Sequence, residues 1–191
     1  VSIIFVIAVI KIFHIDYETY NSGAKYISYL LTPATVCLAI PLYRQISVLK
    51  EHAKEVFIGI LEGVLASMGS ILLMSYLFGL THEQYVTLLP KSITTAIGMG
   101  VSEELGGIQT ITVAVIIITG VLGNIIAEAV LKIFRIKEPV AKGLAIGTAS
   151  HAIGTTKALE IGEIEGAMSS LSVAVAGLMT VISASIFANM M

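Results

Sequence analysis

Two segments of the sequence, residues 85–106 and 139–162, are rich in Gly, Ser and Thr and carry the basic side chains of Lys91 and Lys157. Ammonium groups and hydroxyls donate hydrogen bonds to small anions, of which a carboxylate is the natural candidate. Glycines let the backbone approach a ligand, and a helix N-terminus adds unpaired N–H groups. We therefore predict a substrate-binding set of Lys91, Ser92, Thr94, Thr95, Thr148, Ser150, His151, Gly154, Thr155, Thr156 and Lys157.

Three titratable residues are candidates for coupling such a site to protons. The imidazole of a residue such as His151 titrates near physiological pH. Glu62 and Glu128 lie inside long apolar segments, where a carboxylate is costly and usually faces a polar interior. Glu128 also has a simpler interpretation, an i,i+4 ion pair with Lys132.

The binding residues have structural alternatives as well. Lys91 and Lys157 could extend to the membrane surface without touching a ligand. Ser and Thr in membrane helices more often bond the backbone or a neighbouring helix, and a lone residue such as His151 is more often structural. The sequence leaves these alternatives open.

Composition places the chain in a membrane. Of its 191 residues, 56% are hydrophobic and only 13% are charged, which is too little charge for the surface of a water-soluble domain. A formal net charge of −2 argues against nucleic-acid binding. Cys37 is the single cysteine, which excludes an internal disulfide and a multi-cysteine metal site. The sequence has no nucleophile elbow, no HExxH motif and no phosphate-binding glycine loop, so we expect no enzyme, no catalytic residues, no metal and no cofactor.

Four apolar segments approach or exceed the roughly 20 residues that a spanning helix needs, namely 26–43, 56–80, 108–134 and 164–191. They predict an all-α polytopic membrane protein with a single transmembrane domain over residues 1–191. The shorter apolar run at 1–13 suggests a helix that begins upstream, and the acidic stretch 14–24 is expected to be an outer loop. Basic residues collect on the cytoplasmic side of membrane proteins. We place two loops there, one with Arg44, Lys50 and Lys54 and the other with Lys132, Arg135, Lys137 and Lys142.

The two Gly/Ser/Thr-rich segments also resemble each other. Ala-Ile-Gly at 96–98 aligns with Ala-Ile-Gly at 152–154, and the Glu and Gly at 104 and 106 align with those at 160 and 162. Because one crossing separates the copies, we predict a helical bundle with inverted repeats, about 56–106 and 108–162. Each repeat is a spanning helix followed by a broken or re-entrant element, and the two broken elements are expected to share a cavity.

Small residues spaced four apart predict close helix packing. Gly59 with Gly63, and Gly143 with Gly147, form such pairs.

The sequence resembles the LrgB/CidB family over its whole length. The resemblance rests on LPKSITTAIGMGVSEELGG at 89–107, AKGLAIGTASH at 141–151 and GTTKALE at 154–160. It implies a protein of the bacterial cytoplasmic (inner) membrane, an antiholin-like or holin-like modulator of murein hydrolase export and cell lysis. It also implies a small LrgA/CidA-type membrane partner and an N-terminal helix beyond those seen here. Relatives are implicated in pyruvate movement, and a related plastid translocator exchanges glycolate and glycerate.

Our leading interpretation is a multi-pass transporter of small monocarboxylates, similar to pyruvate or glycolate, that works by alternating access around the broken elements. The alternative is a holin-like or antiholin-like regulator of murein hydrolase export and cell lysis, acting through oligomerisation with an LrgA/CidA-type partner. Both need the lipid bilayer, only the first needs a small carboxylate, and homo-oligomerisation is left open. A carrier should saturate with substrate and fail on Lys157→Ala, whereas a regulator should fail when Gly59 or Gly63 is enlarged.

Overall fold

The computed structural model describes residues 2–29, 33 and 39–191, and every regular element in these ranges is an α-helix. The chain divides into two compact units, unit 1 (Val1–Leu38) and unit 2 (Ala39–Met191), which are described separately. The central part of the predicted helix 26–43, with Cys37, lies outside the described residues. For the described residues the predicted all-α class is confirmed.

Unit 1 contains helices α1 (Ser2–Ile12) and α2 (Tyr17–Ser28). The prediction of a loop over 14–24 is wrong beyond Asp16, because this residue caps α2. Its carboxylate accepts hydrogen bonds from the hydroxyl of Thr19 at 2.6 Å and from the Thr19 backbone N–H at 2.9 Å. These hydrogen bonds hold the pKa of Asp16 below its usual value, and the bond from the Thr19 hydroxyl has the larger effect. The stabilisation from the cap is therefore lost only as the pH falls through that lowered pKa.

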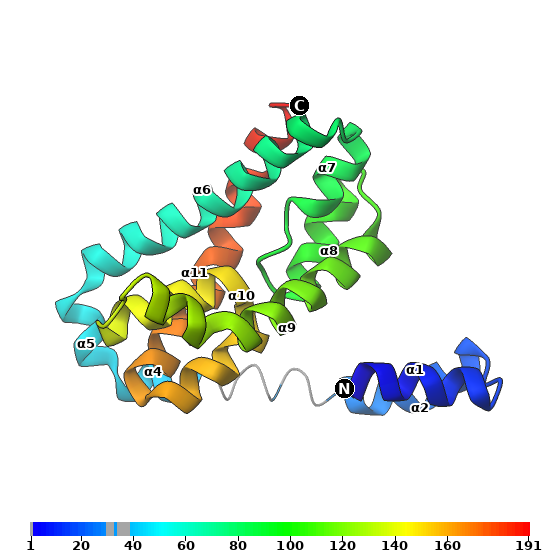
Figure 1. Ribbon diagram of the computed structural model, residues 1–191, viewed down its shortest axis with the longest axis horizontal. Coiled ribbons are helices and arrows are strands. Elements are labelled where there is room, and N and C mark those ends of the chain that lie inside the picture. Colours follow the sequence, from blue (N-terminus) through cyan, green and yellow to red (C-terminus); the bar gives the residue numbers. More distant parts are fainter. Residues whose placement is uncertain (1, 30–32, 34–38) are drawn as a thin grey trace. The chain divides into compact units, whose positions relative to one another are not determined.

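Unit 2 is built on three long apolar helices, α6 (Ala53–Phe78), α9 (Gln109–Ile133) and α11 (Glu163–Ala188) (Figure 1). Each is long and apolar enough to cross a membrane, which confirms the helices predicted over 56–80, 108–134 and 164–191. The other helices of unit 2 are α4 (Ala39–Arg44), α5 (Ile46–Glu51), α7 (His82–Leu88), α8 (Thr95–Glu104) and α10 (Pro139–Ile161).

Local sequence explains several helix ends in unit 2. α6 ends at Gly79, which has a φ of 62° that glycine adopts without steric cost. Thr81 and Gln84 then form a reciprocal capping box that starts α7. Pro139 occupies the first position of α10, where its missing N–H costs nothing.

Both Gly/Ser/Thr-rich segments are interrupted helices. In the first, irregular residues 89–94 separate α7 from α8, and Pro90 has no N–H to continue a helix. In the second, α10 is kinked at His151, whose φ of 43° and ψ of −145° are not helical. The interruptions were predicted. The inverted relation of repeat 56–106 to repeat 108–162, and the membrane side from which each enters, stay predictions.

Two glycines of α10 set its distance from α11. A Cβ added to Gly143 would lie 2.5 Å from the backbone oxygen of Glu165, and one added to Gly147 would lie 2.5 Å from that of Ser169. No real side chain tolerates such distances, so the two backbones are in direct contact. This confirms the close packing predicted from the spacing of these glycines.

Two glycines of α6 play the corresponding part at its contact with α10. A Cβ on Gly59 would lie 3.2 Å from a side-chain atom of Leu144, and one on Gly63 would lie 2.9 Å from the hydroxyl of Thr148. The second predicted glycine pair is therefore also a packing surface.

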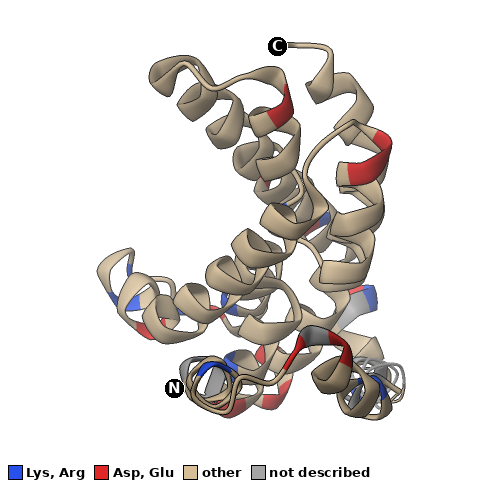
Figure 2. Cartoon of the chain, turned by 90° about the vertical axis from the view of Figure 1, so that its right-hand side faces the viewer, with Lys and Arg blue, Asp and Glu red and all other residues tan. Residues whose placement is uncertain are grey.

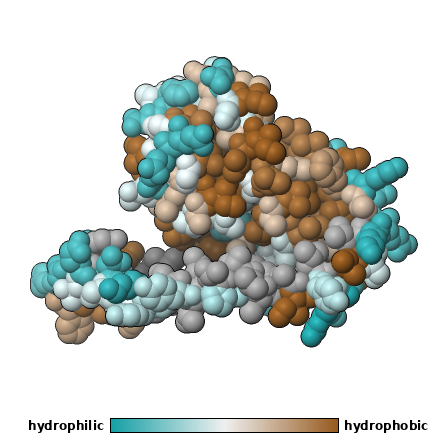
Figure 3. All heavy atoms as spheres, turned by 180° about the vertical axis from the view of Figure 1, so that it is seen from behind, coloured by the Kyte–Doolittle hydropathy of each residue, from teal (hydrophilic) through white to brown (hydrophobic). Residues whose placement is uncertain are grey.

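Large apolar side chains remain exposed on the outside of unit 2. Figure 2 shows long uncharged stretches along its helices, and Figure 3 shows a broad hydrophobic area on one face. Exposed apolar area of this extent is stable in a hydrocarbon solvent but not in water. Examples are Phe57, Ile58, Leu65 and Leu77 on α6 and Ile118, Leu122 and Ile125 on α9.

We expect Gly147→Ala to destabilise unit 2, because its methyl group would meet the backbone of α11 at Ser169. Overpacking of this kind costs about 1–3 kcal/mol. The matched control is Gly69→Ala in α6, where an added Cβ has nothing within 4 Å and should gain up to about 1 kcal/mol of helix propensity. Unfolding in detergent, followed by circular dichroism, measures both. Equal stability of the two variants would contradict the close contact of α10 with α11.

Candidate functional site

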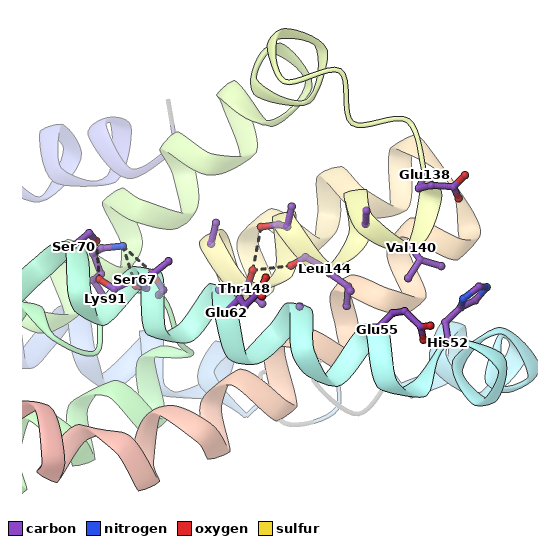
Figure 4. A pocket seen from close by; sticks show the side chains of 17 residues that line it. His52, Glu55, Glu62, Ser67, Ser70, Lys91, Glu138, Val140, Leu144 and Thr148 are labelled. Carbon is purple, nitrogen blue, oxygen red and sulfur yellow. Dashed lines mark hydrogen bonds between the residues drawn. The ribbon is translucent and has the colours of Figure 1, made fainter.

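A groove of about 900 Å³ lies between α6 and the first half of α10, with residues of the 89–94 break at one end (Figure 4). The α6 residues that line it are spaced three or four positions apart, so they share one face of the helix. Many of them have small side chains, which leaves space for the groove. The lining residues are His52 before α6, Glu55, Gly59, Glu62, Gly63, Ala66, Ser67 and Ser70 of α6, Lys91 and Ser92 of the break, Glu138 before α10, and Val140, Ala141, Leu144, Ala145, Thr148 and Ala149 of α10.

Lys91 supplies the positive charge at the end of the groove that the break forms. Its ammonium group donates to the hydroxyl of Ser92 at 2.8 Å and to that of Ser67 at 3.3 Å, and the two hydroxyls are 2.9 Å apart. Among the described residues no carboxylate lies within ion-pair distance of Lys91. An ammonium group flanked by hydroxyls can hold one carboxylate or phosphate oxygen.

Negative charge is spread along the rest of the groove. Glu62 lies midway along α6, and Glu55 and Glu138 lie with His52 toward the other end (Figure 4). Because Glu62 sits inside a helix that could span a membrane, its place in the groove is the polar setting that such a carboxylate needs. Its role in proton coupling stays a prediction.

The predicted residues around the kink of α10 belong to a packed contact outside the groove. His151 is buried, and its Nε2 is 2.9 Å from the backbone oxygen of Ile116 on α9. The hydroxyl of Thr155 donates to the backbone oxygen of His151 at 3.0 Å and lies 2.8 Å from the side-chain hydroxyl of Ser169 on α11. These bonds support the structural alternative for His151 and Thr155.

Ser150 and Gly154 complete that packed contact. A Cβ added to Gly123 of α9 would overlap the Ser150 side chain, and one added to Gly154 would lie 2.5 Å from the Cβ of Ser150. A Cβ on Gly120 would lie 2.7 Å from the imidazole of His151. α9 and the kink of α10 therefore approach each other closely at glycines.

Lys157 lies away from the groove and pairs with carboxylates. Its ammonium group is 2.7 Å from Glu128 of α9 and 3.0 Å from Glu160. The structure thus keeps Lys157 apart from Lys91, and the ion pair predicted between Glu128 and Lys132 gives way to one across two helices. Lys157 already has two opposite charges beside it, which leaves it poorly placed to attract a substrate anion.

The remaining predicted residues are outside the groove as well. Thr156 is exposed and accepts a hydrogen bond from the side-chain amide of Asn124 at 2.8 Å. Thr94 and Thr95 are half-buried at the start of α8. Of the predicted substrate-binding set, the groove contains Lys91, Ser92 and Thr148.

The sequence analysis did not single out two serines that the structure places in the groove, whereas the hydrogen-bonding role that the sequence suggests for Asn124 is confirmed. Ser67 and Ser70 line the groove, and Asn124 also donates to the backbone oxygen of Ile153 at 3.0 Å, next to the kink. The sequence contains a signal for the two serines, because Gly59, Glu62 and Gly63 precede them at helical spacing on one face of an otherwise apolar helix.

We expect the groove to contain water, which thiol labelling can measure. In a Cys37→Ser background, Ala66→Cys places a thiol in the groove, and its neighbour Leu65→Cys places one on the exposed apolar surface outside the groove. The two positions differ by only about 1.5 Å in depth along the helix. A charged, membrane-impermeant reagent should modify Ala66→Cys much faster in proteoliposomes, because only a hydrated thiol forms the reactive thiolate. Equal rates would show that the groove is dry.

The family of the chain follows from comparison with known proteins. Residues 1–190 match the LrgB-like family. Proteins named antiholin-like protein LrgB from Bacillus mycoides (strain KBAB4), Bacillus cereus (strain B4264) and Bacillus anthracis (strain CDC 684 / NRRL 3495) are each 39% identical to it over 182 residues. These residues are 95% of this chain and 79% of each relative. No solved structure matches the chain. A match over nearly the whole length, together with the three apolar helices, shows that this membrane protein belongs to the LrgB-like family.

Proposed function

We propose that the protein is an antiholin-like regulator of murein hydrolase export and cell lysis in the bacterial cytoplasmic membrane. The observation that carries this proposal is the similarity, over 95% of the chain, to proteins named antiholin-like protein LrgB. The exposed apolar faces of α6 and α9 support it, since a regulator acts through contacts between membrane helices. The partner would be a small LrgA/CidA-type membrane protein.

A second candidate function, the transport of small monocarboxylates, is favoured by one observation. The groove between α6 and α10 ends at Lys91, an ammonium group held by two hydroxyls and free of ion pairs among the described residues. In this function Lys91 binds the substrate carboxylate, Ser67 and Ser92 orient it, and Glu62 is the candidate for proton coupling. The family relationship supports the regulator better than the carrier, and neither function requires catalysis.

Uptake into liposomes separates the two functions. For a carrier, Lys91→Met should raise the KM for labelled pyruvate or glycolate about tenfold to a hundredfold, because a hydrogen bond to a charged group contributes about 1.5–3 kcal/mol. Lys157→Met is the matched control, since Glu128 and Glu160 occupy that lysine outside the groove. If the correctly inserted protein shows no saturable uptake, with or without a small LrgA/CidA-type partner, the transport function is ruled out.

For a regulator, the expected pattern is the reverse. In cells that lack their own copy, the protein should change the rate of autolysis, and Lys91→Met should preserve that effect. Gly147→Leu should abolish it, because its side chain would separate α10 from α11 at Ser169, outside the groove. Loss of lysis control in Lys91→Met, at normal membrane levels, would instead tie regulation to the groove.

A further inference from the structure

A second pocket, of about 540 Å³, lies where α9 ends and α10 begins. Its apolar wall consists of Leu131, Ile136 and Ile161. The charged residues that line it are Glu128, Lys132, Arg135, Lys137 and Lys142. We call it the corner pocket. None of its basic residues lines the groove between α6 and α10.

The ion pairs of the described residues leave an excess of positive charge in the corner pocket. Glu128 is taken by Lys157 at 2.7 Å, and Lys142 lies 3.5 Å from Glu165. Glu138 follows Lys137 in the sequence, but it lines the groove between α6 and α10. Three exposed cations, those of Lys132, Arg135 and Lys137, therefore have no carboxylate within 4.0 Å in the described part of the chain.

Arg135 occupies a backbone position that favours glycine. The backbone N–H of Arg135 donates to the backbone oxygen of Lys132, and the backbone N–H of Ile136 donates to the backbone oxygen of Leu131. This pair of hydrogen bonds is typical of a helix that ends on a residue in the left-handed conformation. Arg135 has a φ of 55°. Elsewhere in unit 2, the helices that end on a left-handed residue have Gly79 and Gly106 there. An arginine kept where glycine is favourable points to a use for its side chain.

The corner pocket also lies at the depth of lipid headgroups. α9 has 25 residues and is about 37 Å long, somewhat more than the roughly 30 Å of a bilayer core. Its end therefore reaches the interface. Ile133 and Phe134, beside the cations, are 74% and 72% exposed, as expected for side chains that enter the acyl region.

The helix dipole alone does not explain these features. Cations in the last turn of α9 would be favourable at any helix C-terminus. That effect requires neither a pocket with an apolar wall nor a strained backbone at Arg135, and it does not reach Lys137, which lies beyond the helix end.

We propose that the corner pocket binds a phosphate group, that of an anionic lipid headgroup, through Lys132, Arg135 and Lys137, with the acyl chains against Ile133 and Phe134. Guanidinium and ammonium groups supply the charge-assisted hydrogen bonds that phosphate oxygens accept. Basic pockets between membrane helices on the cytoplasmic side are suited to such headgroups.

The test uses the full chain in detergent, with phosphatidylglycerol as the probe and phosphatidylcholine as the neutral reference, and native mass spectrometry as the readout. Replacing Lys132, Arg135 and Lys137 together by Gln should weaken phosphatidylglycerol binding about a hundredfold, since each basic residue near an anionic headgroup contributes roughly fivefold. The matched control replaces Arg44, Lys50 and Lys54 by Gln, which removes the same charge outside the corner pocket.

A further variant separates binding from folding. Arg135→Gly should raise the unfolding temperature, because it relieves the left-handed φ, and should still weaken phosphatidylglycerol binding. Equal loss of phosphatidylglycerol binding in the two triple variants would overturn the proposal, because it would show that binding depends only on the net charge of the protein. Competition by millimolar glycerol phosphate would show that the corner pocket binds a soluble phosphate compound and would overturn the proposal of a lipid ligand. The absence of competition would support the lipid ligand.

Discussion

The close approach of α10 to three long helices is the constraint on which unit 2 depends. α10 touches the backbone of α11, the α6 wall and α9, and at each contact glycine removes the side chain that would hold the helices apart. Without a hydrophobic driving force between helices in lipid, such van der Waals contact is a main source of their association. The glycines concerned are Gly59 and Gly63 of α6, Gly120 and Gly123 of α9, and Gly143 and Gly147 of α10.

These close contacts with α6, α9 and α11 allow α10 to be kinked at His151, which is not a glycine. A kink leaves backbone groups without helical partners, which is costly at membrane depth unless neighbouring side chains satisfy them. Next to the kink, Thr155 donates to the backbone oxygen of His151 and Asn124 donates to that of Ile153. The imidazole of His151 in turn lies 2.9 Å from the backbone oxygen of Ile116 on α9. The histidine thus stabilises its own kink against α9, and the space for a ligand is displaced to the side of α10 that faces α6.

The sequence predicts the long helices, both interruptions and the packing glycines because each depends on composition or spacing over a short window. It does not predict how the polar residues divide. Lys91, Ser92 and Thr148 reach the groove, whereas Ser150 lies on the side of α10 that faces Gly123 of α9. The predicted residues after the kink at His151 lie elsewhere because the kink changes the angular phase of α10. The partner of Lys157 is equally invisible, since Glu128 is 29 positions away and becomes a neighbour only when α9 packs on α10. Helical spacing carries no information across a kink or between two helices.

The distribution of charge in the groove narrows what a carrier of this shape would accept. One cation, Lys91, lies at one end, and Glu55, Glu62 and Glu138 lie along the remainder. A second negative charge on a ligand held at Lys91 would be repelled by these carboxylates. If the groove carries a substrate, this charge distribution would favour a monocarboxylate over a dicarboxylate. The proposed regulator would instead use the exposed apolar sides of α6 and α9, which are distinct from the groove. Gly59 and Gly63 both pack against α10 and line the groove, whereas Gly143 and Gly147 pack against α11 outside it.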